Sequence, residues 1–166
     1  IWLPKSVLAA KIPLIRSFQY LVIMTIAQIP GYYSAVFLVV KVGRKAILGT
    51  YLALTALSSF MYASSTTIIE MLLWGSLLSF FDLGSWAAIY AYTPEQYPTH
   101  ARGLGSSWAS AIGRIGAIIG PYIVPSLVAI GGWYLAFSFF ALVHLIGAAA
   151  AFMGREMKGK ELPEIT

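Results

Sequence analysis

Five long apolar segments dominate the chain and restrict it to a membrane fold. They cover residues 17–40, 46–64, 68–92, 104–130 and 133–153. About 20 helical residues cross the roughly 30 Å of hydrocarbon in a bilayer, so each segment is long enough to span it. The segments lack the strict polar–apolar alternation that the strands of a membrane barrel show. The sequence therefore predicts an all-α integral membrane protein with five full transmembrane helices.

The overall composition supports a membrane fold and excludes several other classes. Hydrophobic residues make up 59% of the 166 residues and charged residues only 10%, whereas soluble domains carry about 25% charged residues. A soluble fold of this length has too little interior to bury so many apolar side chains. The absence of cysteine excludes disulfides and thiolate metal sites. The net charge of +5 does not indicate a nucleic-acid partner, because the basic residues flank the apolar segments instead of forming one stripe.

The distribution of Lys and Arg predicts which loops face the cytoplasm. Short links join most of the segments, so neighbouring helices are expected to run antiparallel. The face richer in basic residues is expected to be cytoplasmic, in the inner (plasma) membrane of a multi-pass protein. That face holds Lys41, Arg44, Lys45, Arg102, Arg155, Lys158 and Lys160, and the other holds Lys5, Lys11 and Arg16. On this topology residues 1–16 are the end of a preceding helix and an external loop, and residues 154–166 are a cytoplasmic tail.

Three charged stretches at the predicted loops resemble motifs of one transporter family. "PEQYPTHARGLG" resembles the P-E-x-x-P-T-x-x-R-G-x-G loop between the tenth and eleventh helices of the major facilitator superfamily. "KVGRK" resembles the G-R-K/R turn between helices eight and nine, and "REMKGKELPE" resembles the sugar-porter tail P-E-T-K-G-x-x-L-E. The chain departs from these patterns at Val40, Arg155 and Met157, where the family has an acid, a proline and a threonine.

This resemblance implies an architecture and an activity. The chain would be the C-terminal half of a twelve-helix transporter, comprising helices eight to twelve and the end of helix seven, without the N-terminal six-helix half. The best match is to sugar-porter relatives that carry niacin-like and other organic ions with protons. The expected function is secondary transport of a small organic solute, an organic anion moved with protons, by alternating access and without a cofactor. The alternatives are a sugar or organic-cation porter, or a non-transporting membrane protein that is degenerate or regulatory.

The loop between the third and fourth segments predicts a cytoplasmic gate. Pro94 and Pro98 are expected to end the preceding helix and to stiffen the turn. Glu95 could then pair with Arg44 or Arg102 where the helix ends meet, and in the family such pairs hold the inner side shut. The alternative is a solvated loop that only obeys the positive-inside rule. The expected gate residues are Glu95, Arg102, Arg44 and Lys45.

Two opposite charges fall within the apolar segments. Asp82 and Arg114 each lie ten residues from the predicted cytoplasmic end of their helices, or about 15 Å deep at 1.5 Å per residue. Charges at that depth usually face a cavity or a partner. One interpretation is a static Asp82–Arg114 pair that joins two helices, and another is a misjudged helix rotation. A third is that the planar guanidinium of Arg114 binds a substrate carboxylate while Asp82 exchanges a proton.

Polar and aromatic residues near these charges complete the expected substrate site. Gln28 and Tyr32 share one side of the first segment, next to Pro30, which is expected to bend the helix. Trp86 lies on the face that carries Asp82, and Ser110 on the face that carries Arg114, although such residues also serve as packing contacts. The predicted substrate-binding residues are Arg114, Asp82, Gln28, Trp86, Ser110 and Tyr32, and Asp82 is also the predicted proton-coupling residue.

Three remaining features have structural interpretations. Thr67 and Glu70 have the spacing of a capping box at a helix start. Gly116 and Gly120 are four residues apart, which permits close approach of another helix. His144 could relay protons, but a lone histidine in a helix bundle is more often a hydrogen-bonded interior group.

The sequence does not predict an enzyme. It contains no nucleophile–base set, no spacing typical of metal ligands and no phosphate-binding loop. "GLGSSW" lacks the third glycine of a dinucleotide-binding fingerprint and follows no predicted strand. No metal and no cofactor are therefore expected, and the expected partners are the lipid bilayer, the solute and the other six-helix half.

Overall fold

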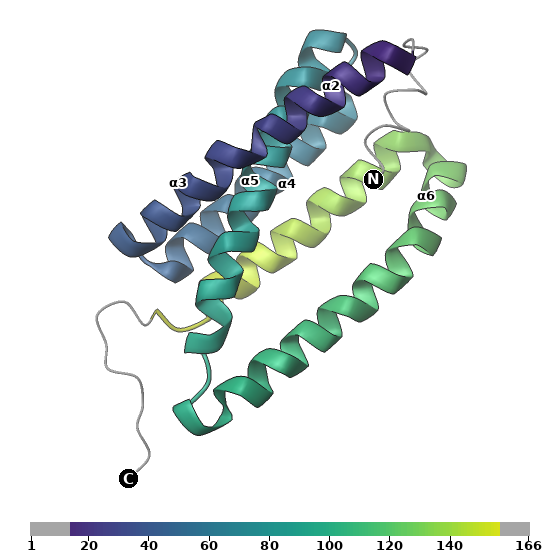
Figure 1. The fold of residues 1–166 in the computed structure, drawn as a ribbon. Coiled ribbons are helices and arrows are strands. Elements are labelled where there is room, and N and C mark those ends of the chain that lie inside the picture. The colour runs from purple at the N-terminus through teal and green to yellow at the C-terminus, as the bar shows by residue number, and fades with distance from the viewer. Residues whose placement is uncertain (1–13, 157–166) are drawn as a thin grey trace.

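The computed structural model describes residues 14–156, and every regular element in that range is helical (Figure 1). The expectations for residues 1–13 and for 157–166 lie outside the described residues. The elements are α2 (Leu14–Ile26), α3 (Gln28–Lys41), α4 (Arg44–Ser64), α5 (Ile68–Glu95), the 3₁₀ turn η1 (Thr99–Ala101) and α6 (Arg102–Met153).

The first apolar segment forms two helices, α2 and α3, which meet at Ala27. Pro30 lies one turn further along and has no N–H to donate to the carbonyl of Ile26, so the helical hydrogen-bond ladder is interrupted there. Ala27 keeps helical backbone angles, and its N–H donates to the carbonyl of Ile23. The two helices therefore continue in one general direction, and Phe18–Lys41 is long and apolar enough to cross a membrane.

Helix α6 is a hairpin of two helical arms. Gly131 and Gly132 depart from helical backbone angles, and Gly132 has a φ of 67°, a conformation that glycine adopts without steric cost. Figure 1 shows the chain reversing at this point, so that the second arm runs back beside the rest of the bundle. We call residues 102–130 the first arm and residues 133–153 the second arm.

The packed body of the molecule consists of α3, α4, α5 and the second arm, with α2 extending it. One apolar cluster joins Ala35 of α3, Tyr51 of α4, Ala88 of α5 and Ala151 of the second arm. The hydroxyl of Ser59 donates to the carbonyl of Phe137, which ties α4 to the second arm. Small residues at these contacts let helices approach closely, as is usual in membrane proteins.

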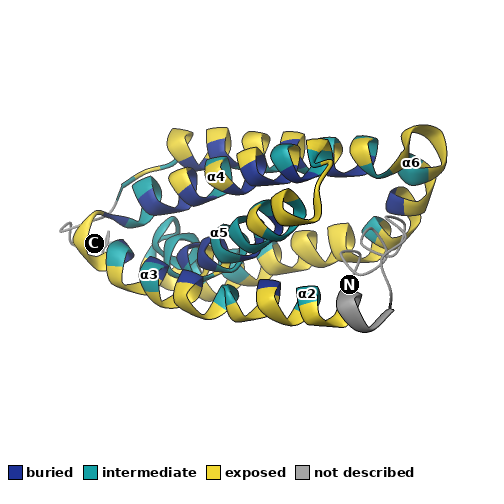
Figure 2. Ribbon diagram, turned by 90° about the horizontal axis from the view of Figure 1, so that it is seen from above, coloured by how far each residue is buried: buried dark blue, intermediate teal, exposed yellow. Residues whose placement is uncertain are grey.

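The first arm lies largely outside this body. Most of its residues are exposed (Figure 2), including the large side chains of Trp108, Ile118 and Tyr122. A β-carbon added to Gly116 or Gly120 would meet no described atom within 4 Å. The predicted close approach at these glycines therefore does not occur in this structure, and the arm presents apolar surface that water does not favour.

The predicted start of α5 agrees with the structure, and its predicted end does not. The Thr67 hydroxyl accepts from the N–H of Glu70, and the Glu70 carboxylate accepts from the N–H of Thr67, so the predicted capping box is confirmed. The prediction that Pro94 ends its helix is wrong, because α5 continues to Glu95 and Pro94 lies in its last turn. Its missing N–H leaves only one carbonyl, that of Tyr90, without its helical donor, and near a helix end this is tolerated.

Candidate functional site

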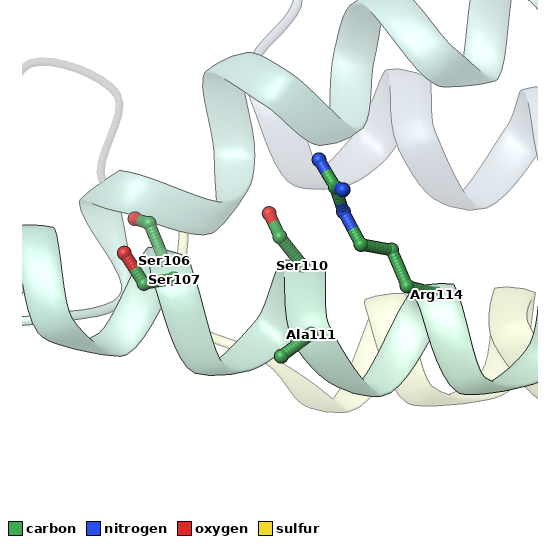
Figure 3. Close-up of a pocket in the computed structure, with 5 residues that line it drawn as sticks. All are labelled: Ser106, Ser107, Ser110, Ala111 and Arg114. Atoms are coloured by element: carbon green, nitrogen blue, oxygen red, sulfur yellow. The ribbon is translucent and has the colours of Figure 1, made fainter.

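A recess of about 370 Å³ opens beside the first arm of α6. It is lined by Ser106, Ser107, Ser110, Ala111 and Arg114. It is largely open, because all five lining residues belong to one helix. Figure 3 shows Ser110 and Arg114 pointing to the same side of the helix, whereas Ala111 is turned away. The recess thus combines one cation with the hydroxyl groups of Ser107 and Ser110, whereas the hydroxyl oxygen of Ser106 is itself buried.

Helical spacing explains why these side chains converge. Ser106, Ser110 and Arg114 follow one another at intervals of four residues, so they form a row along one face of the arm. Arg114 is exposed and forms no ion pair or hydrogen bond with any residue that the structure describes. Its position twelve residues into α6 is about 18 Å from the start of the helix, at 1.5 Å per residue. The guanidinium of Arg114 therefore has no partner among the described residues.

The carboxylate of Asp82 pairs with His144, which the sequence favoured only as a hydrogen-bonded interior group. Oδ1 of Asp82 in α5 lies 3.3 Å from Nε2 of His144 in the second arm, 62 residues away along the chain. Asp82 and Arg114 form no ion pair among the described residues, so the interpretation of a static Asp82–Arg114 pair is wrong for this structure. The two helices carry the charges at similar depth, but the second arm of α6 packs in the body and the first arm does not. A signal was present in the sequence, since His144 is the one histidine within an apolar segment.

Three other predicted substrate residues lie outside the recess. Gln28 begins α3 directly after the helix break and is half-buried. Tyr32 is exposed and packs edge-on against Tyr33, with ring centroids 6.1 Å apart. Trp86 is exposed, and its ring lies 5.8 Å from that of Tyr90. Their assignment to a substrate site stays a prediction. Ser106, which lines the recess, was missed because serines of membrane helices so often serve as packing residues.

Charged residues gather at one end of the bundle, where the α3–α4 turn, the α5–α6 loop and the end of α6 lie together (Figure 1). Oε1 of Glu95 is 3.1 Å from Nε of Arg44, so the predicted ion pair between these residues is confirmed. The N–H of that nitrogen is not aligned for a hydrogen bond, and the contact is therefore electrostatic. Arg102 has Nε and one Nη buried without a hydrogen-bond partner. It lies near the loop but does not pair with Glu95 here.

The start of the C-terminal tail joins the same end through contacts that the sequence does not predict. The backbone N–H of Lys45 donates to Oε2 of Glu156 at 3.2 Å, so this carboxylate caps the first turn of α4. The side-chain amide of Gln96 bonds both backbone groups of Arg155, donating to its carbonyl at 2.9 Å and accepting from its N–H at 3.2 Å. We call Arg44, Lys45, Glu95, Gln96, Arg155 and Glu156 the helix-end cluster.

The long apolar helices, the exposed hydrophobic surface and the polar recess define the chain as a multi-pass α-helical membrane protein. Four helical stretches in the described part of the chain are long and apolar enough to cross a bilayer, and α6 contributes one that contains its hairpin. Residues 16–165 match the family model of the Major Facilitator Superfamily. The chain belongs to this superfamily.

Individual relatives agree with this assignment. The chain is 42% identical, over 99% of its length, to the niacin transporter NiaP of Acinetobacter baylyi. It is 45% identical, over 98% of its length, to the putative niacin/nicotinamide transporter NiaP of Bacillus subtilis. It is also 29% identical, over 97% of its length, to the synaptic vesicle 2-related protein of Xenopus laevis. The two NiaP relatives are named as transporters and not as enzymes, as the sequence predicted.

The matched region is only part of each relative. The chain covers 38% of the Acinetobacter protein, 41% of the Bacillus protein and 29% of the Xenopus protein. It therefore spans about two fifths of the length of the two niacin-transporter relatives.

Proposed function

We propose that the chain forms the C-terminal half of a twelve-helix carrier that works by alternating access between two halves. The length of α6 supports five membrane crossings. At 1.5 Å per residue its 52 residues would extend about 78 Å, more than twice the roughly 30 Å hydrocarbon core. The break at Gly131 and Gly132 divides the helix into two arms of suitable length. In this arrangement, lipid and the N-terminal half would cover the exposed surface of the first arm.

We propose that the solute is a small aromatic acid of the niacin type, carried with protons. The single observation that carries this proposal is the recess in which Arg114 lies one helical turn from Ser110, with Ser107 further along the same arm. Niacin is a pyridine carboxylic acid, and a guanidinium can bind a carboxylate through two parallel hydrogen bonds. The hydroxyl groups can donate to the same anion or accept from a protonated ring nitrogen. The names of the relatives at 42% and 45% identity support this class of solute.

The recess favours the acid over the amide. Nicotinamide has the same ring but no negative charge, so it would lose the charge-assisted bonds to Arg114 that strengthen the binding of the acid. We expect a carrier that contains this chain to take up nicotinate in preference to nicotinamide.

Replacing Arg114 tests this proposal in the complete gene product. Arg114→Lys keeps the charge but removes the planar guanidinium group, and Arg114→Gln removes the charge. We expect both to raise the KM for nicotinate at least about tenfold, which corresponds to 1.4 kcal/mol, with little change in protein abundance. Competition by nicotinamide should change less. Ser126→Ala is a matched control on the same arm, because the Ser126 hydroxyl donates only to the carbonyl of Tyr122 in its own helix.

One result would contradict the proposed anion site. If Arg114→Lys reduces uptake and protein abundance by the same factor, Arg114 has a structural role and the proposed anion site is wrong.

We propose that the end of the bundle bearing the helix-end cluster is cytoplasmic and that the protein lies in the inner membrane. The excess of Lys and Arg at this end supports the orientation. The chain has no cysteine, so once any cysteine elsewhere in the complete gene product is replaced, a single introduced cysteine reports accessibility. Thr99→Cys and Thr66→Cys place exposed thiols at the two ends of α5. A membrane-impermeant reagent added to intact cells should label Thr66→Cys and not Thr99→Cys, and the reverse would overturn the orientation.

A further inference from the structure

The side chain of His144 makes two hydrogen-bond contacts that together determine its tautomer. Nδ1 lies 2.7 Å from the backbone carbonyl of Phe140, one turn earlier in the second arm. A carbonyl oxygen can only accept a hydrogen bond, so Nδ1 must carry a proton. In the neutral imidazole, Nε2 is then the nitrogen with the lone pair.

The second contact needs one more proton. Nε2 lies 3.3 Å from Oδ1 of Asp82. A neutral imidazole with its proton on Nδ1 and an ionised carboxylate would present two acceptors to each other, which is unfavourable. A proton on either atom turns the contact into a hydrogen bond. The pair is therefore stable either as imidazolium and carboxylate or as imidazole and carboxylic acid. Both forms hold one proton more than a neutral imidazole beside an ionised carboxylate.

The surroundings contain no competing charge in the described spans. Helix α6 packs chiefly against α4 and α5, and its second arm contacts both, through Ser59 with Phe137 and through Asp82 with His144. Residues 46–64 of α4 include no Asp, Glu, Lys or Arg, and between Glu70 and Glu95 the only charged residue of α5 is Asp82. Of the tyrosines of α4, Tyr51 shares a hydrogen bond with Ser34, and the ring of Tyr62 packs against Phe137. Arg114, the remaining charged residue at this depth, forms no ion pair with Asp82.

The pair is also open enough to exchange its proton. The side chain of Asp82 is 46% exposed and that of His144 is 24% exposed. The carboxylate of Asp82 is therefore partly accessible, while the imidazole of His144 is held between Phe140 and Asp82.

We propose that His144 and Asp82 form one proton-binding unit that links α5 to the second arm of α6. When the proton is present, the two side chains are bonded and the helices are joined at this point. When it leaves, two facing acceptors repel and the link opens, so the protonation state biases how α5 and the second arm are arranged. The assignment of this unit as the coupling site of a carrier rests on the proposed function, but the binding of the proton does not.

Nitrogen NMR of the purified chain in lipid nanodiscs tests the proton site directly. The chain has two histidines, so His100→Asn leaves His144 as the only one. With ¹⁵N-histidine labelling, we expect the neutral form of His144 to keep its proton on Nδ1, with Nε2 exchanging its proton as the pH changes. Asp82→Asn should lower the proton affinity of His144 at least about tenfold, since an adjacent opposite charge is worth roughly 1–3 pK units. Asp82→Glu, which keeps a carboxylate, should lower it less.

Three outcomes would overturn the proposal. A neutral His144 with its proton on Nε2 would contradict the deduced tautomer. The same proton affinity in the Asp82→Asn protein would show that the residues do not share a proton. An Nε2 signal that does not respond to pH while the protein stays folded would show that no proton exchanges there.

A transport measurement separates this inference from the proposed function. In proteoliposomes of the complete gene product, His144→Gln and Asp82→Asn should abolish accumulation driven by an imposed pH gradient, whereas solute exchange without a gradient persists. If the NMR results hold but wild-type uptake ignores the gradient, the proton unit stands and proton-coupled transport is wrong. If gradient-driven accumulation survives in His144→Gln, His144 has no part in coupling.

Discussion

Gly31 in α3 lies so close to the main-chain carbonyl of Phe80 in α5 that no β-carbon fits between them. A β-carbon on Gly31 would overlap the oxygen, the carbonyl carbon and the α-carbon of Phe80, all of which belong to the backbone of a packed helix. Near the same crossing, Gly84 of α5 faces Tyr51 and the carbonyl of Gly31. The approach of α3 to α5 therefore depends on residues without side chains.

Gly31→Ala should destabilise the protein by forcing α3 away from α5. Overpacking of a well-packed interior costs about 1–3 kcal/mol, and backbone atoms cannot rotate aside as a flexible side chain can. We expect a lower apparent Tm of the purified protein in detergent. Gly147→Ala is the matched control, because a β-carbon there would meet only Leu52 at an ordinary distance of 3.6 Å. A Gly31→Ala protein as stable as the Gly147→Ala protein would contradict this crossing.

Reversing the charge at Glu95 should impair the helix-end cluster, and a compensating reversal should restore it. Glu95→Arg places two guanidinium groups together, since Glu95 lies 3.1 Å from Arg44. Both side chains are partly exposed, so the pair is worth about 0–1 kcal/mol. A bias of that size shifts a balanced equilibrium between inward-open and outward-open states by at most about fivefold.

The measurement is the initial rate of solute uptake by the complete gene product. We expect Glu95→Arg to slow uptake and Arg44→Glu combined with Glu95→Arg to recover it. A double variant no better than the single one would show that the 3.1 Å contact contributes little to the transport cycle.

Glu156 should stabilise the start of α4 from the far end of the chain. Its carboxylate accepts from the N–H of Lys45, where the partial positive charge of a helix N-terminus favours an anion. Glu156→Gln keeps the shape but removes the charge, and should cost about 0.3–1 kcal/mol at low ionic strength. The loss should shrink as salt is added to a thermal denaturation series. A loss that is independent of salt would indicate packing instead of charge.

Gly43 makes a second test of the same junction. It precedes α4 with a φ of 127°, which residues with a side chain rarely adopt, and a β-carbon there would lie 2.7 Å from Oε2 of Glu156. Gly43→Ala should therefore destabilise the protein by more than Glu156→Gln does, as measured by apparent Tm. The opposite order would show that the turn relaxes freely.

Thr67→Ala should weaken the start of α5. The variant removes the hydroxyl that accepts from the N–H of Glu70 at 3.2 Å, and loss of such a cap typically costs about 1 kcal/mol. Hydrogen exchange at the first turn of α5 should accelerate, while exchange in the interior of α4 stays unchanged. Thr67→Ser keeps the hydroxyl and serves as the control. Unchanged exchange in Thr67→Ala would mean that the cap does not limit fraying.

Much of the local structure could be predicted from the sequence because it depends on neighbouring residues. The length and polarity of each segment determine which stretches can form membrane helices. The Thr67–Glu70 cap needs only the residues of one helix end, and the ion pair of Arg44 with Glu95 follows from where charged residues fall relative to those ends. Motif resemblance also pointed to the correct superfamily.

The partner of Asp82 could not be predicted in this way. A helical pattern tells which residues share a face, but neither which helix that face meets nor how far each helix is rotated. Arg114 and His144 lie on the two arms of one hairpin, and the arm that packs beside α5 determines which of them meets Asp82.

The sequence by itself thus determined the membrane-spanning helical class, the superfamily and, to within a few residues, the ends of most helices, because these depend on composition and on contacts within a few residues. Only the tertiary structure decided that Gly31 meets Phe80, that Glu156 caps α4 and that Asp82 faces His144 while Arg114 opens into a recess. The physical reason is that interhelical packing depends on the shape of whole helix surfaces, and many arrangements satisfy the same local pattern.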